Sequence, residues 1–117
     1  MTLEQLAFVF FAAVALGGAL MSGLIAAKLR VPRGLAPLHG LGGLAGVGLL
    51  LTANLSHAAA TPRAWLALGV FAAGLAGGVL FFAILFPKRT PLPLIAAHGS
   101  LGAIGLYLLY RVAFAAA

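Results

Sequence analysis

The chain contains four long apolar runs, each long enough to cross a membrane as a helix. The runs cover residues 6–27, 34–55, 64–86 and 92–110. A helix needs about 20 apolar residues to cross a hydrocarbon core about 30 Å thick. Since a span in lipid must satisfy its own backbone groups, and these runs lack the two-residue alternation of barrel strands, they predict four helices.

Composition agrees with a chain that is embedded in a membrane. Of the 117 residues, 64% are hydrophobic and 7% are charged, which leaves too few polar side chains to coat a soluble domain. Short connections between the runs predict an all-α membrane protein, an up-down four-transmembrane-helix bundle in a single domain over residues 1–117. The first run has no basic segment before it, so we expect a retained helix rather than a cleaved signal peptide.

Three sequence motifs predict where helices begin. Thr2 and Gln5 have the spacing of a capping box, in which each side chain binds the backbone N–H of the other residue. The pairs at 61–62 and 90–91 each place a threonine before a proline, which predicts an N-cap followed by proline at the first helical position.

The two halves of the chain resemble each other, which predicts two tandem helical hairpins at about residues 6–55 and 64–114. Residues 11–18 read FAAVALGG and residues 71–78 read FAAGLAGG. Because each copy contains two spans, both copies enter the membrane in the same direction and form a parallel repeat. Equivalent residues of the two copies are therefore expected at the same depth.

A second part of the repeat carries the candidate site. The pattern H-G-x-x-G-x-x-G begins at His39 and again at His98, on the second and fourth spans, which lie diagonally opposite in an up-down bundle. The two imidazoles are thus predicted to face each other across the core. The glycines that share each histidine's helical face, four and seven residues further on, are Gly43, Gly46, Gly102 and Gly105. They predict either close helix packing or a slot for a flat ligand.

These residues resemble those of the b-type membrane cytochromes, helical bundles that hold haem between histidines on different helices. The resemblance implies one haem b per chain, with His39 and His98 as the iron ligands and the four glycines beside the macrocycle. Respiratory members carry a second histidine 13 or 14 residues further along each ligand helix. Here those positions are Thr52 and Ala53, and Arg111 and Val112, so one haem is expected.

Several alternatives remain open at this point. The histidines could be hydrogen-bonded core residues, ligands of copper or another metal, or members of a proton relay. The absence of cysteine excludes disulfides and thiolate ligands. For the whole chain, an electron carrier is favoured over an enzyme with its own substrate. The alternatives are a cofactor-free membrane interaction subunit and an oligomeric transporter.

Basic residues predict the orientation in the membrane. The first and third connections carry five of the seven, namely Lys28, Arg30, Arg33, Lys88 and Arg89, against Arg63 and Arg111 at the other end. By the positive-inside rule both termini lie outside the cytoplasm, as in a bacterial inner membrane. Since the basic residues flank apolar segments, they are expected to contact lipid headgroups, not nucleic acid.

The remaining predictions concern single polar residues and partners. Arg33 comes shortly before His39 and is the first candidate to pair with a haem propionate. His57 is expected to be an exposed residue of the second connection, and Glu4 to stabilise the positive end of the first helix. Candidate partners are quinol, a redox protein docking on the basic connections, and further copies of the chain.

Overall fold

The computed structural model describes residues 1–57 and 60–115, and in this part of the chain all regular structure is helical. The elements are α1 (Leu3–Ala26), α2 (Leu35–Ser56), α3 (Pro62–Gly78), the π-helix η1 (Val79–Leu85) and α4 (Leu92–Ala113). η1 continues α3, and the segment Pro62–Leu85 and the three other helices are each long and apolar enough to cross a membrane. The predicted all-α membrane bundle is confirmed.

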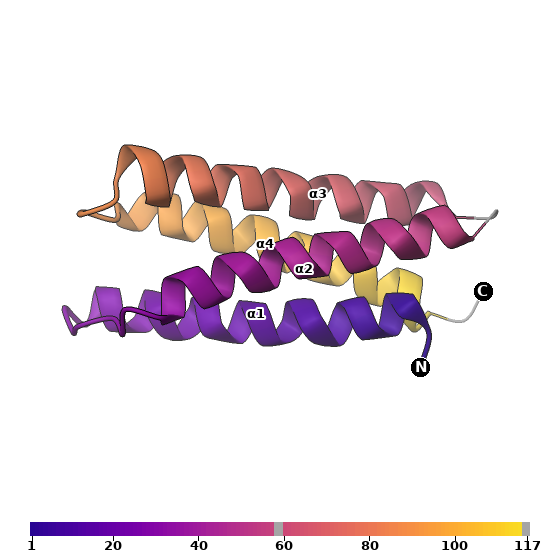
Figure 1. Ribbon diagram of the computed structural model, residues 1–117, viewed down its shortest axis with the longest axis horizontal. Coiled ribbons are helices and arrows are strands. Elements are labelled where there is room, and N and C mark those ends of the chain that lie inside the picture. Colours follow the sequence, from indigo (N-terminus) through magenta and orange to yellow (C-terminus); the bar gives the residue numbers. More distant parts are fainter. Residues whose placement is uncertain (58–59, 116–117) are drawn as a thin grey trace.

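The helices run up and down in the order of the chain. α1 contacts α2 and α4, and α3 contacts the same two helices, so α2 and α4 are diagonal neighbours. Both termini lie at one end of the bundle, here called the terminal end, while the α1–α2 and η1–α4 connections lie at the other, here called the loop end (Figure 1). The bundle measures 45 × 22 × 22 Å, so its long axis suits a bilayer.

Two of the three predicted helix starts are confirmed. Thr2 and Gln5 form the capping box of α1, and the Thr61 hydroxyl accepts a hydrogen bond from the Ala64 N–H at 3.2 Å. The prediction for Thr90 is wrong, because α4 begins at Leu92 and no side chain caps it. Pro91 takes the N-cap position instead, with extended backbone and with its carbonyl accepting the first helical hydrogen bonds.

The packed core lies in the terminal half of the bundle. Phe11 of α1 and Phe71 of α3 stack across the axis, with ring centroids 3.7 Å apart and planes 5° from parallel. Leu50 and Leu109 are fully buried around this pair. The phenylalanine stack therefore joins the two diagonal helices that do not carry the histidines.

The loop half of the bundle is packed differently. Within the described residues, none of those at 12–45 or 72–104 is buried, although these ranges hold more than half of each hairpin. Both histidines of the repeat lie in this half. The buried core thus ends at the phenylalanine stack, and every described residue beyond it is at least partly exposed.

Candidate functional site

His39 and His98 meet at the axis of the loop half. Their ring centroids are 6.1 Å apart and their planes are inclined by 63°. One ring comes from α2 and the other from α4, and both side chains are half-buried. The structure therefore brings together two imidazoles that are far apart in the sequence.

The orientation of His39 is fixed by a backbone group of α1. Its Nδ1 lies 2.9 Å from the carbonyl oxygen of Val14. A carbonyl oxygen can only accept, so Nδ1 carries the hydrogen of this bond and Nε2 of the neutral ring has a free lone pair. Metal-binding histidines are typically held in this way, with the second nitrogen donating to a carbonyl or carboxylate.

Two glycines on α1 and α3 make room for the imidazoles. A Cβ atom built on Gly18 would lie 2.8 Å from Cε1 of His39, and one built on Gly78 would lie 3.1 Å from Cε1 of His98. The first distance is shorter than real Cβ contacts, and the second would require the His98 ring to move by a few tenths of an ångström. Each imidazole therefore lies against bare backbone of the first helix of its own hairpin.

We expect Gly18→Ala to displace the His39 ring, because the new methyl group would lie only 2.8 Å from Cε1, and a displaced ring weakens its hydrogen bond to the Val14 carbonyl. The neighbouring Gly17→Ala is a matched control, since a Cβ there meets nothing within 4 Å. ¹⁵N NMR of the histidine side chains should show the protected Nδ1–H of His39 in the wild type and in Gly17→Ala, but not in Gly18→Ala. An unchanged resonance in Gly18→Ala would contradict the contact.

The glycines predicted from the sequence have other neighbours. A Cβ on Gly46 or Gly105 would lie 2.8 Å from the ring of Phe11 or Phe71, so these two glycines accommodate the phenylalanine stack. Gly43 faces Leu75 at ordinary contact distance, and a Cβ on Gly102 would meet nothing within 4 Å. Gly43 and Gly102 thus lie between the histidines and the stack.

A reciprocal pattern in the sequence could have identified these contacts. In an antiparallel hairpin, a residue later in the first helix meets a residue earlier in the second. The interval from Phe11 to Gly18 equals the interval from His39 to Gly46. When Phe11 contacts Gly46, Gly18 therefore contacts His39. The second hairpin repeats this arrangement of one large and one small residue at each contact.

The two histidines have different surroundings. The ring of Phe82, from η1, lies edge-on to His98 with centroids 5.4 Å apart. The corresponding residue of the first hairpin is Ser22, whose hydroxyl donates to the Gly18 carbonyl at 2.8 Å. π-Helical turns are often found at functional sites, and this one was not predicted from the sequence. His39 is thus held by a hydrogen bond and His98 by an aromatic contact.

The basic residues predicted to lie near the site are exposed at the same end of the bundle. Arg33 is part of the turn that precedes α2, and Arg30, Lys88 and Arg89 lie in the two connections of the loop end. A groove of about 230 Å³ on the outer surface runs beside His39. Its walls come from both helices of the first hairpin and include Phe10, Ala13, Gly17, Leu35 and Leu38.

The donor set suits a cofactor that needs only two protein ligands. Among the described residues, no group of three or more His, Cys, Asp or Glu side chains lies close enough to bind one ion. A haem supplies four ring nitrogens itself and takes its axial ligands from the protein. Two imidazoles that bind one metal from opposite sides, at about 2 Å each, place their ring centroids roughly 6 Å apart, close to the 6.1 Å observed. Two imidazoles are thus the kind and number of ligands that a haem takes from a protein.

Comparison of the chain with protein-family models, with curated proteins and with solved structures found no match.

Proposed function

We propose that this protein is a membrane electron carrier that binds one haem b between His39 and His98. The observation that carries the proposal is the pair of imidazoles, 6.1 Å apart on diagonal helices. A bound haem would supply one-electron chemistry at its iron. Held by both His39 and His98, such a haem would favour electron transfer over the binding of an exogenous ligand.

The chain's own residues hold and shield such a site. His39 is oriented by the Val14 carbonyl, and His98 by Phe82. Gly18 and Gly78 leave the flanks of both imidazoles bare. The phenylalanine stack lies between the site and the terminal half of the bundle. The exposed arginines of the loop end are available to pair with the propionate carboxylates of a haem. Of these, Arg33 is nearest to His39 along the chain.

The position of the site favours electron exchange at one face of the membrane. His57, the third histidine, follows His39 by a length of helix equal to about 27 Å at 1.5 Å per residue, so it cannot share the site. Five basic residues lie at the loop end, which we therefore assign to the cytoplasm, for example in a bacterial inner membrane. Both termini then lie outside.

The groove beside His39 favours a redox partner that is dissolved in the membrane. Its walls are almost entirely apolar and it opens on the outer surface of the first hairpin, where Phe10 and Leu38 are exposed. A quinol could approach His39 from the lipid by this route without crossing the bundle. A redox protein would instead dock on the basic loop end.

Absorption spectroscopy tests the proposal. Tag-free protein purified from haem-replete cells should carry one non-covalent haem per chain by the pyridine haemochrome assay, with sharp visible bands after dithionite reduction. Colourless protein that is folded and helical would contradict the proposal, and would favour a cofactor-free interaction subunit.

A further inference from the structure

The two imidazoles of the histidine pair are not held equally firmly. His39 is tied to α1 by a directional hydrogen bond, with 2.9 Å between its Nδ1 and the Val14 carbonyl oxygen. The second hairpin has Gly74 at the position of Val14, and among the described residues this hydrogen bond is not repeated for the His98 ring. The orientation of His98 therefore depends on packing.

The packing of His98 against the second hairpin comes from a ring and a glycine. The Phe82 ring lies edge-on to the imidazole, with centroids 5.4 Å apart and planes inclined by 89°. On another side the imidazole rests against Gly78, where a Cβ would lie 3.1 Å from His98 Cε1. Aromatic rings in this T-shaped geometry attract each other, but with less directional preference than a hydrogen bond. Phe82 is thus the side chain that opposes rotation of His98.

The backbone that carries Phe82 departs from the helical repeat at this contact. The π-helix η1 begins directly after Gly78, where α3 meets His98. The corresponding part of α1 remains α-helical, and Ser22 takes the position of Phe82 there. π-Helical turns are rare, and they are frequent at functional sites. The second hairpin therefore presents a large ring to its histidine where the first hairpin has a small hydroxyl group.

We propose that His98 is the exchangeable member of the pair, and that Phe82 is the positioning residue that keeps its imidazole directed toward His39. When the Phe82 ring is removed, His98 turns away from the axis more often, whereas His39 stays bound to the Val14 carbonyl. The consequence for ligand binding rests on the proposed function. With haem bound and reduced, the position that His98 vacates accepts a small neutral ligand such as carbon monoxide. One lone-pair donor then replaces another, so the exchange transfers no electron or proton.

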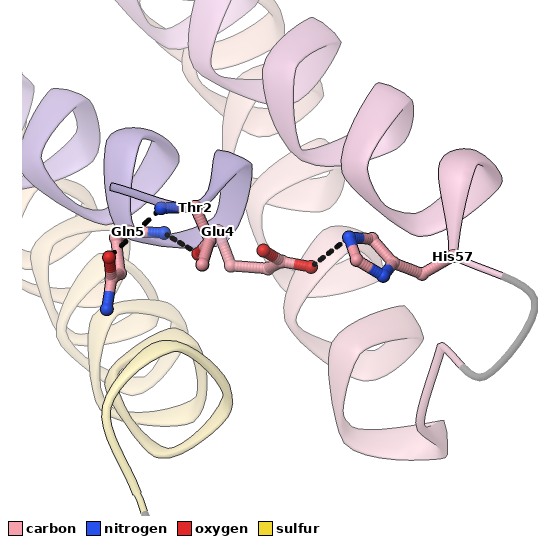
Figure 2. Close-up of polar contacts among 4 residues, drawn as sticks. All are labelled: Thr2, Glu4, Gln5 and His57. Carbon is pink, nitrogen blue, oxygen red and sulfur yellow. Dashed lines mark hydrogen bonds and ion pairs between the residues drawn. The ribbon is translucent and has the colours of Figure 1, made fainter.

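NMR relaxation of the haem-free protein, labelled with ¹³C-histidine, tests the role of Phe82. We expect the Cε1–H bond of His98 to be more mobile on the ps–ns timescale in Phe82→Ala than in the wild type, and that of His39 to be unchanged. His57 is an internal reference, because it lies at the terminal end with its Nε2 3.4 Å from Glu4 Oε1 (Figure 2). Its relaxation should be the same in all variants.

Two further variants make this test specific. Phe81 lies in the same π-helical turn and is half-buried like Phe82, but it packs against Gly77, so Phe81→Ala should leave the motion of His98 unchanged. Phe82→Leu loses the ring and keeps an apolar side chain, so the same increase in His98 motion is expected there even if Phe82→Ala does not fold. Circular dichroism of each variant confirms that the helices are retained. Equal mobility of His98 in the wild type and in both Phe82 variants would overturn the proposal.

Carbon monoxide titration of the reduced, haem-loaded protein tests the exchange. We expect carbon monoxide to bind about fivefold more tightly to Phe82→Ala than to the wild type or to Phe81→Ala, the effect of losing one aromatic contact. The protected Nδ1–H of His39 should persist in the ¹⁵N spectrum of the complex. Equal affinity in Phe82→Ala and Phe81→Ala would overturn the proposal.

Two other outcomes separate this proposal from the proposed function. Loss of the His39 resonance on carbon monoxide binding would overturn the present proposal alone, because His39 would then be the exchangeable ligand. Colourless protein would contradict the proposed function and the ligand exchange that rests on it. The relaxation measurement needs no haem, so it would still decide whether Phe82 positions His98.

Discussion

Replacing either histidine of the pair is expected to remove the cofactor. In His39→Ala or His98→Ala we expect at least a tenfold fall in haem per chain, because one of only two protein ligands is lost. Loss of a mere supporting hydrogen bond to a metal ligand already costs about 10- to 100-fold in metal affinity. The loss should be greater for His39, whose ring is oriented by the Val14 carbonyl before any ligand binds. Haem per chain is measured by pyridine haemochrome on purified protein.

The matched control for this result is His57→Ala. It removes the third histidine, which lies at the terminal end against Glu4, and should leave haem content unchanged. Imidazole added to the purification should restore part of the haem in His98→Ala by occupying the vacated space. Haem content that is insensitive to both His39→Ala and His98→Ala would contradict the ligand assignment.

Removing one ring of the phenylalanine stack is expected to have the largest effect on stability. We expect Phe11→Ala to lower the free energy of unfolding by about 3 kcal/mol, in the range for phenylalanine-to-alanine changes in packed cores. Phe11 is 5% exposed, stacks on Phe71 and fills the space left by Gly46. Because the two rings share one interface, the Phe11→Ala/Phe71→Ala double variant should lose less unfolding free energy than the two single variants lose together.

The neighbouring Phe10→Ala provides the control for Phe11→Ala. Phe10 is 37% exposed and faces the surface groove, so we expect a change within about 0.5 kcal/mol. Both variants are compared by equilibrium unfolding in detergent micelles. Equal decreases in the free energy of unfolding for Phe10→Ala and Phe11→Ala would show that the stack does not organise the core.

The fold was predictable because the bilayer leaves few choices for this sequence. Four runs of sufficient length, with short connections, determine four helices and their up-down order. The repeat predicted that His39 and His98 face each other. Equivalent residues of the second and fourth helices lie at the same depth, and these two helices are diagonal neighbours in the bundle. The caps at Thr2 and Thr61 followed from local hydrogen bonding alone.

The spacing of residues within one helix did not predict the contacts of the glycines, which become visible only when the two helices of a hairpin are paired. Spacing shows which residues share a face, but not which side chain of a neighbouring helix fills the space beside them. Gly46 and Gly105 share a face with the histidines, yet they pack against phenylalanines, while the histidines rest on Gly18 and Gly78. Similarly, the π-helical turn of η1 and the contact of Glu4 with His57 depend on tertiary packing, for which the sequence has no local signal.

His39 and His98 together are proposed to hold one haem iron. The most direct test is pulsed electron-nuclear spectroscopy of the oxidised protein, labelled with ¹⁵N-histidine. We predict a low-spin ferric signal with hyperfine couplings from two histidine nitrogens bound to the iron. A high-spin signal, or coupling to only one histidine, would contradict the claim.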